Sequence, residues 1–216
     1  MNTKVKVCGI TSSEDALAAA HEGAAAIGFI FVQNSARYLQ PQRARQIIRS
    51  LPPFVTPVGV VTRTSRLEAL ALVAESGIRC LQLHEDCDPN EFTDFPIPCY
   101  RVFRVGPDFN VEQLPDIGGG AFMLDTYVDG LAGGTGKTFD WTIAVKAKQF
   151  GSLILSGGIN PHNVGDAIRR VSPYAIDVNS GVEQSPGVKD HAKLRSFFRA
   201  IEEAEDNDES RKVVVR

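Results

Sequence analysis

Two residues with acid–base side chains stand at the ends of separate apolar runs in this 216-residue chain. Cys8 follows "KVKV", and Asp125 follows "AFML". A thiol and a carboxylate that lie together can transfer protons, because one group takes a proton while the other gives one. Cysteine is also a small side chain that packs easily in a core. Whether the two residues transfer protons or only pack in the core therefore depends on where the strands and helices place them.

Two glycine-rich turns form a second group suited to chemistry. "LSGGINPHN" places Gly157 and Gly158 between an apolar run and a predicted helix with Asn160 as its N-cap. "VNSGVE" offers the amides of Ser180 and Gly181. Backbone N–H groups without bulky side chains, close to a helix N-terminus, attract anions. The two turns together predict a phosphate site.

A third glycine-rich stretch, "LAGGTGKT", resembles a nucleotide-binding P-loop without matching it. The P-loop pattern requires a glycine five places before Gly136, and Leu131 stands there. We therefore expect a flap beside the site, with Lys137 reaching the substrate, and no nucleotide hydrolysis.

Eight short apolar runs recur along the chain, and helical segments separate most of them. The runs are "VKVCGI" 5–10, "AIGFIF" 26–31, "PVGVVT" 57–62, "CLQLH" 80–84, "CYRVFRV" 99–105, "AFMLDTY" 121–127, "SLILSG" 152–157 and "AIDVNSG" 175–181. Strands that alternate with helices indicate a covered parallel sheet. Eight such units predict an α/β fold, a single-domain (β/α)8 TIM barrel over residues 1–204, with 205–216 as a charged, flexible tail. A doubly wound open sheet is the alternative, which is weakened because no G-x-G-x-x-G follows the first run.

Several signals mark where the helices of this barrel begin. Thr11 and Glu14 match a capping box, Pro41 suits a first-turn position, and Asn160-Pro161 is expected to open the helix after the seventh strand. The segments "DPNEFTDF" and "NVEQLPDI" are weak helices by the same criteria.

The strand ends of a barrel carry its active site, so the first strand is informative. Side chains alternate along a strand, which places Lys6 and Cys8 on one face and the valines on the helix side. A lysine inside the barrel needs a partner, and Asp177 on the neighbouring eighth strand is a candidate. The Lys6 ammonium would then lower the pKa of the Cys8 thiol and favour the thiolate.

Composition limits the partners and the kinds of site. A formal net charge of -3 and a pI near 5.8 argue against nucleic acid and anionic membranes as partners. Neither a spanning run of ~20 apolar residues nor the apolar region of a secretory signal is found, so we expect a cytoplasmic protein. The four cysteines form no C-x-x-C pair, and we expect no metal and no disulfides.

Seven motifs carry a resemblance to a known family. In order along residues 4–200 they are "KVCGIT", "GFIFVQNSARYL", "LQLH", "MLDT", "GGTGKTFDW", "LSGGINPHNV" and "DVNSGVE…PGVKD". Their combination resembles phosphoribosylanthranilate isomerase of tryptophan biosynthesis. The resemblance implies an Amadori rearrangement of the small-molecule substrate N-(5′-phosphoribosyl)anthranilate without a cofactor. We expect a monomer or weak homo-oligomer.

The resemblance also implies roles for particular residues. Asp125 would be the general acid that protonates the furanose ring oxygen, and Cys8 the general base that removes the C2′ proton. Arg37 would hold the anthranilate carboxylate, and Asp177 would lie beside the reacting sugar. The amides of the two glycine-rich turns (Gly157, Gly158, Ser180 and Gly181) would bind the phosphate.

Two departures and several alternatives accompany this resemblance. Relatives often have glycine where this chain has Glu85-Asp86, and an aromatic residue where it has Val61, so the expected anthranilate pocket departs from the family pattern at these positions. His84 either lines that pocket or packs in the barrel rim. One alternative function is the histidine-pathway isomerase, whose family uses an aspartate at the position of Cys8. The others are a synthase-type barrel that cleaves indole-glycerol phosphate and a barrel without catalytic activity that binds phosphate sugars or partners.

Overall fold

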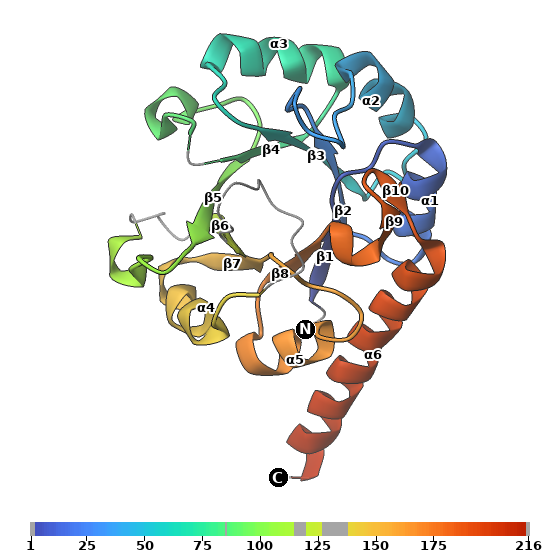
Figure 1. The fold of residues 1–216 in the computed structure, drawn as a ribbon, viewed down its shortest axis with the longest axis vertical. Helices are drawn as coiled ribbons and strands as arrows, with labels where there is room; N and C mark the ends of the chain where they lie inside the picture. Colours follow the sequence, from blue (N-terminus) through green and yellow to red (C-terminus); the bar gives the residue numbers. More distant parts are fainter. Residues whose placement is uncertain (1–2, 85, 115–119, 127–137, 215–216) are drawn as a thin grey trace.

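The computed structural model describes residues 3–84, 86–114, 120–126 and 138–214. Eight parallel strands close into a barrel in chain order, with β1 paired to β8 (Figure 1). The strands are β1 (Lys4–Val7), β2 (Ala26–Ile30), β3 (Thr56–Val61), β4 (Cys80–Leu83), β5 (Cys99–Val105), β6 (Ala121–Thr126), β7 (Ser152–Leu155) and β8 (Ala175–Val178). The predicted (β/α)8 barrel is confirmed, and the open-sheet alternative is wrong.

Helices surround the strands on the outside of the barrel. They are α1 (Ser13–His21), α2 (Pro41–Ile48), α3 (Arg66–Ser76), α4 (Trp141–Ala147), α5 (Val164–Val171) and α6 (His191–Val214). After β4 and β5 the chain forms only the short 3₁₀ turns η1 (Pro89–Phe92) and η2 (Val111–Gln113), as the weak helical signals there predicted. A third turn, η3 (Lys148–Phe150), follows α4.

Two of the predicted helix starts are wrong in detail. The N-cap of α1 is Ser12, whose hydroxyl accepts from the N–H of Asp15, whereas Thr11 donates its hydroxyl to the carbonyl of Gly187 at 2.5 Å. A tertiary contact thus occupies the side chain that the local pattern assigned to a cap. The helix after β7 begins at Val164, because a turn follows Asn160 first. Pro41 is at the first position of α2, as expected.

The core has two layers that follow from the alternation of side chains along the strands. A large cluster fills the space between barrel and helices, and a small one fills the barrel itself. The small cluster consists of Val58, Tyr100, Val102, Met123, Ile154 and Ala175. Polar side chains, including Lys6, Gln82 and Asp177, are also buried, although such groups rarely enter a core without partners. Of these side chains, Gln82 and Asp177 line a pocket at the carboxyl ends of the strands.

The C-terminal segment continues α6 as far as Val214 (Figure 1). The flexibility predicted for residues 205–216 stays a prediction. Near its start the Glu205 carboxylate accepts from the N–H of Thr3 at 2.5 Å, which ties the helix to the beginning of the chain. The expected flap with Lys137 lies outside the described residues, as does Glu85. No described helix is both long enough and apolar enough to cross a membrane.

Candidate active site

A pocket lies at the carboxyl ends of the barrel strands. Its lining includes seven of the eight site residues predicted from the sequence, which come from β1, β6, β7, β8 and the turns after them. The full lining is Cys8, Ile30, Val60, Gln82, His84, Met123, Asp125, Ser156, Gly157, Gly158, Ile159, Asp177, Asn179, Ser180 and Gly181. Arg37 is absent from this lining. Among the described residues no group of His, Cys, Asp and Glu side chains could hold a metal ion.

Asp125 stands near the end of β6 with an unusually weak acidity. Burial raises the pKa of its carboxyl to about 6, and the negative charge of Asp177 acts in the same direction. The N–H of Thr126 donates to one carboxylate oxygen at 2.9 Å, which opposes this effect only in part. A carboxyl with this pKa is protonated often enough near neutral pH to donate a proton.

Cys8 follows β1 and is only 4% exposed. Its position depends on Gly28 of β2, since a β-carbon there would lie 2.8 Å from the Cys8 sulfur and 3.0 Å from Cε of Lys6. Burial raises the pKa of the Cys8 thiol above its ordinary value, although the Lys6 ammonium acts in the opposite direction. The predicted effect of Lys6 is present, but it is too small to make the thiolate the main form, as burial outweighs it.

Lys6 and Asp177 form the ion pair that the strand pattern predicted. Lys6 Nζ donates to Asp177 Oδ1 at 2.6 Å, and both side chains are buried. The hydroxyl of Ser156, at the end of β7, donates to the other oxygen of Asp177 at 3.2 Å. Each oxygen of the Asp177 carboxylate, which lines the pocket, therefore accepts one hydrogen bond. One cation and one hydroxyl hold it in place.

The two glycine-rich turns meet at one side of the pocket. Gly157 and Gly158 adopt positive φ angles of 87° and 68°, which glycine allows without strain. A β-carbon on Gly157 would collide with Thr126, and one on Gly181 would collide with the carbonyl of Ile159. The side-chain amide of Asn163 donates to the Gly158 carbonyl at 2.9 Å and fixes the turn. The close packing of these turns explains why glycine is required here.

Free amides complete this corner of the pocket. Within the described parts of the chain, the backbone N–H groups of the predicted phosphate residues Gly157, Gly158, Ser180 and Gly181 donate to no protein group. Ser180 also begins the turn η4 (Ser180–Val182). Such a cluster of unpaired N–H groups suits an oxyanion with several acceptor atoms, such as a phosphate monoester.

Arg37 lies in the segment between β2 and α2 and is held by a residue that sequence reasoning missed. Its Nε and Nη2 donate to the carboxylate of Glu183 at 2.9 Å and 2.6 Å. Lys189 binds the same carboxylate at 2.8 Å. The signal was present in "EQSPGVK", where a glutamate and a lysine flank a Pro-Gly turn that favours a hairpin. The partner of Glu183 is 146 positions away and no local pattern shows it.

His84 is among the residues that line the pocket. Burial lowers the pKa of its imidazole to about 4, so the ring is neutral at pH 7. The amide nitrogen of Gln82 lies 3.5 Å from His84 Nε2, and Tyr100 donates its hydroxyl to the Gln82 oxygen at 3.0 Å.

Asp86 pairs with Arg63 at the surface, 3.0 Å away. This carboxylate is therefore neutralised outside the pocket.

The chain is similar throughout its length to proteins of one family. The family model described as N-(5'phosphoribosyl)anthranilate (PRA) isomerase matches residues 5–200. An N-(5'-phosphoribosyl)anthranilate isomerase of Prosthecochloris aestuarii is 44% identical over 96% of this chain and 98% of that protein. One from Pseudomonas putida is 45% identical over 94% of this chain and 99% of its own length.

Solved structures agree with these sequence relatives. The phosphoribosyl anthranilate isomerase of Thermotoga maritima superposes with a TM-score of 0.86 at 37% identity, covering 93% of this chain and 99% of that one. Another, with a TM-score of 0.83 at 35% identity over 93% and 99% of the two chains, is in complex with reduced 1-(o-carboxyphenylamino)-1-deoxyribulose 5-phosphate.

Proposed function

We propose a mechanism for this chain, which belongs to the N-(5'-phosphoribosyl)anthranilate isomerase family and is an isomerase of tryptophan biosynthesis. The reaction is the Amadori rearrangement of N-(5′-phosphoribosyl)anthranilate to 1-(2-carboxyphenylamino)-1-deoxyribulose 5-phosphate. Asp125 acts as the general acid and Cys8 as the general base. The observation that carries the proposal is that both groups line one pocket, beside a cluster of free backbone amides.

The first step is opening of the ribose ring. Asp125 donates its proton to the ring oxygen while the bond between that oxygen and C1′ breaks. The aniline nitrogen supplies the electron pair and becomes a positively charged Schiff base. The pKa of about 6 supports this role, because the carboxyl carries a transferable proton closer to neutral pH than an ordinary aspartate does.

The second step removes the proton from C2′. The Cys8 thiolate takes this proton, and the electrons of the C–H bond move into the Schiff base, which loses its charge. The resulting enolamine then tautomerises to the ketoamine, with a proton added at C1′ and the proton of the C2′ hydroxyl released. The imine is the electron sink, so the mechanism needs no cofactor. Lys6 favours the thiolate, although burial keeps most Cys8 in the thiol form.

Two ionic groups anchor the substrate at its ends. The amides of Gly157, Gly158, Ser180 and Gly181 receive the phosphate. Arg37, in the segment after the carboxyl end of β2, receives the anthranilate carboxylate, since a planar guanidinium matches a planar carboxylate. Asp177, which lines the pocket, faces the reacting sugar. The neutral His84 lines the pocket as well.

Membership of this family decides against the histidine-pathway isomerase and the synthase-type barrel that cleaves indole-glycerol phosphate. We infer a cytoplasmic, metal-free enzyme from its composition and reaction class. The oligomeric state stays a prediction of a monomer or weak homo-oligomer, whereas a Thermotoga maritima relative is described as dimeric.

The direct test of this proposal uses freshly prepared N-(5′-phosphoribosyl)anthranilate. Wild-type protein should remove the anthranilate fluorescence of the substrate with enzymatic turnover, and the product should be the ketoamine by mass spectrometry and NMR. A double variant, Cys8→Ala with Asp125→Asn, serves as the negative control. Turnover that is equal in the wild type and in this variant would rule out the assigned acid–base pair.

A further inference from the structure

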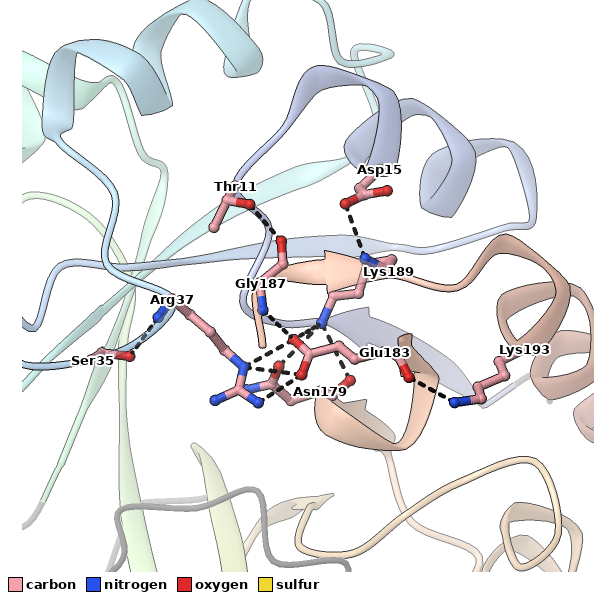
Figure 2. A network of polar contacts seen from close by, with 9 residues as sticks. All are labelled: Thr11, Asp15, Ser35, Arg37, Asn179, Glu183, Gly187, Lys189 and Lys193. Carbon is pink, nitrogen blue, oxygen red and sulfur yellow. Dashed lines mark hydrogen bonds and ion pairs between the residues drawn. The ribbon is translucent and has the colours of Figure 1, made fainter. Parts of the chain in front are cut away.

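The segment after β8 folds back over the edge of the site. It forms η4 and then a small hairpin of β9 (Glu183–Ser185) and β10 (Val188–Lys189) before α6 begins. Two contacts attach the hairpin to the segment that follows Cys8. The Thr11 hydroxyl donates to Gly187, and the N–H of Lys189 donates to Asp15 at 3.1 Å (Figure 2). The hairpin is thus a fixed support for the side chains that it carries inward.

Glu183 occupies one edge of the Arg37 guanidinium. Its carboxylate accepts from Nε at 2.9 Å and from Nη2 at 2.6 Å, which is a two-bond ion pair. A guanidinium has five N–H donors in a fixed plane, and this pair uses two of them on the side edge. The end edge, formed by Nη1 and the second hydrogen of Nη2, receives no carboxylate from the described residues. A second, planar carboxylate fits that edge.

Lys189 sets the charge of this cluster. Its Nζ binds Glu183 at 2.8 Å and two oxygens of Asn179 at 3.1 and 3.2 Å, so all three of its donors are used. The carboxylate also accepts from the N–H of Gly187 at 3.2 Å. Two cations and one anion leave a single positive charge, which an added carboxylate would neutralise. If Lys189 were absent, the charges of Arg37 and Glu183 would cancel. A substrate anion would then gain little electrostatic attraction from the cluster.

The ionisation states of Glu183 and Arg37 support this account, whereas burial lowers the pKa of Lys189, an effect that the charge of Glu183 opposes. Burial disfavours the charged form of Glu183, but hydrogen bonds from Arg37 and the charge of Lys189 outweigh it and hold the pKa of the carboxyl below its ordinary value. Glu183 is therefore an anion at neutral pH. The hydrogen bonds to Glu183 also raise the pKa of Arg37.

Gly9 connects the cluster to the reacting groups. A β-carbon on Gly9 would lie 2.7 Å from Cδ of Arg37 and 2.5 Å from Oδ1 of Asn179. Because Gly9 has no side chain, the stem of Arg37 passes directly over the residue next to Cys8. Its positive φ of 73° is itself suited to glycine. Arg37 thus lies over Gly9, the residue that follows the proposed base Cys8 in the sequence.

We propose that Glu183 is a positioning residue that, together with Lys189, orients Arg37 so that the free end edge of the guanidinium receives the carboxylate of the substrate. This inference rests on the proposed function, in which Arg37 binds that carboxylate. Glu183 does not touch the substrate. It acts through Arg37, and Figure 2 shows the carboxylate of Glu183 turned toward the guanidinium of Arg37.

The test compares two substrates in Glu183→Gln. One is N-(5′-phosphoribosyl)anthranilate, and the other is N-(5′-phosphoribosyl)aniline, which lacks the carboxylate. The measured quantity is kcat/KM for the carboxylated substrate divided by kcat/KM for the aniline substrate. The variant should lower this ratio on the order of tenfold, mainly through a higher KM for the carboxylated substrate, because an uncoupled guanidinium loses its two-bond geometry. Turnover of the aniline substrate should stay close to that of the wild type.

Three other results would overturn the inference. An unchanged ratio, with wild-type turnover of both substrates, would mean that Arg37 needs no support from Glu183. A higher ratio would mean that Glu183 competes with the substrate for Arg37. An equal loss for both substrates would mean that the variant only distorts the site. Glu203→Gln makes the same change in an exposed surface pair with Arg199 and should leave the ratio at the wild-type value.

Arg37→Ala separates this inference from the proposed function. If it abolishes the preference for the carboxylated substrate while Glu183→Gln does not affect it, the proposed role of Arg37 stands and the role of Glu183 falls. If Arg37→Ala leaves the preference intact, both fall. Should Glu183→Gln not fold, Glu183→Asp keeps the negative charge beside Lys189 and withdraws the carboxylate by about 1.5 Å. The same fall in the ratio is expected, and its absence would overturn the inference.

Discussion

Lys6 and Asp177 are direct partners across the seam that closes the barrel, where β1 meets β8. Their side chains form an ion pair of 2.6 Å in the interior. Cys8, two residues beyond Lys6, is next to this pair and is affected by both charges. The cation lowers the pKa of the thiol and the anion raises it. The closing seam of the barrel therefore also controls the proposed base.

Replacing Lys6 by Met should raise the pKa of the Cys8 thiol further, because the lysine is the largest influence that opposes burial. The measurement is the rate of alkylation by iodoacetamide against pH, in a background where Cys80, Cys87 and Cys99 are replaced. The midpoint for Lys6→Met should lie at higher pH than that for the parent. Superimposable curves would show that Lys6 does not influence Cys8.

The same ion pair should also determine stability. Lys6→Met leaves the Asp177 anion buried without its cation, which costs about 3–5 kcal/mol of unfolding free energy. Adding Asp177→Asn removes the unpaired charge and should restore most of that loss, since neutral replacements of buried pairs are often tolerated. Urea unfolding of both variants provides the comparison. A double variant no more stable than the single one would contradict this explanation.

Removing either proton-transfer group should lower kcat by at least ~10²-fold, the usual contribution of general acid–base catalysis. The variants are Asp125→Asn and Cys8→Ala, assayed as folded proteins with N-(5′-phosphoribosyl)anthranilate. Asp166→Asn is the matched control, because this exposed carboxylate on α5 pairs with Arg169 at the surface. Near-normal kcat in either of the first two variants would remove that residue from the mechanism.

The fold could be predicted because its signals are local. Each strand is a short apolar run, and residues such as Pro41 mark the helix starts directly. The Lys6–Asp177 pair followed from two rules, alternation along a strand and closure of the last strand on the first. The N-cap of α1 was misplaced by one residue because Thr11 is used in a contact with Gly187, far along the chain.

The supports of the site were harder to predict than its reacting groups. Glu183 and Lys189 act through tertiary contacts, and neither residue belongs to a barrel strand. The sequence alone therefore showed Arg37 without the carboxylate that holds it. The acidity of Cys8 was also misjudged, since a strand pattern shows which charge is near but not how completely water is excluded. Desolvation proved to be the larger effect.

The pH dependence of kcat/KM should reveal the unusual order of the two pKa values. The acid must be protonated, and Asp125 has a pKa of about 6, whereas the base must be ionised, and the pKa of Cys8 lies above its ordinary value. Below pH 6 the rate should rise with pH as thiolate forms. Between the two pKa values each gain in thiolate is cancelled by loss of protonated Asp125, so a plateau is expected, followed by a fall above the pKa of Cys8. In Asp125→Asn the residual rate should instead keep rising through pH 6, and a break retained there would assign it to another group.

Gly28 should be essential for placing the thiol. A β-carbon at this position would lie 2.8 Å from the Cys8 sulfur and 3.0 Å from its α-carbon, so either the side chain or the strand must move. Gly28→Ala should therefore destabilise the protein by ~1–3 kcal/mol, as overpacking of a core does, and lower kcat. Gly165→Ala is the control within α5, since its β-carbon would lie 3.2 Å from the flexible end of Arg169 and 3.6 Å from the carbonyl oxygen of Ala200, which is ordinary contact. This variant should keep full activity and gain up to about 1 kcal/mol, because alanine favours the helix. Thermal unfolding and steady-state kinetics measure both effects. A Gly28→Ala protein with wild-type kcat and stability would show that β2 leaves more room around Cys8 than the contacts allow.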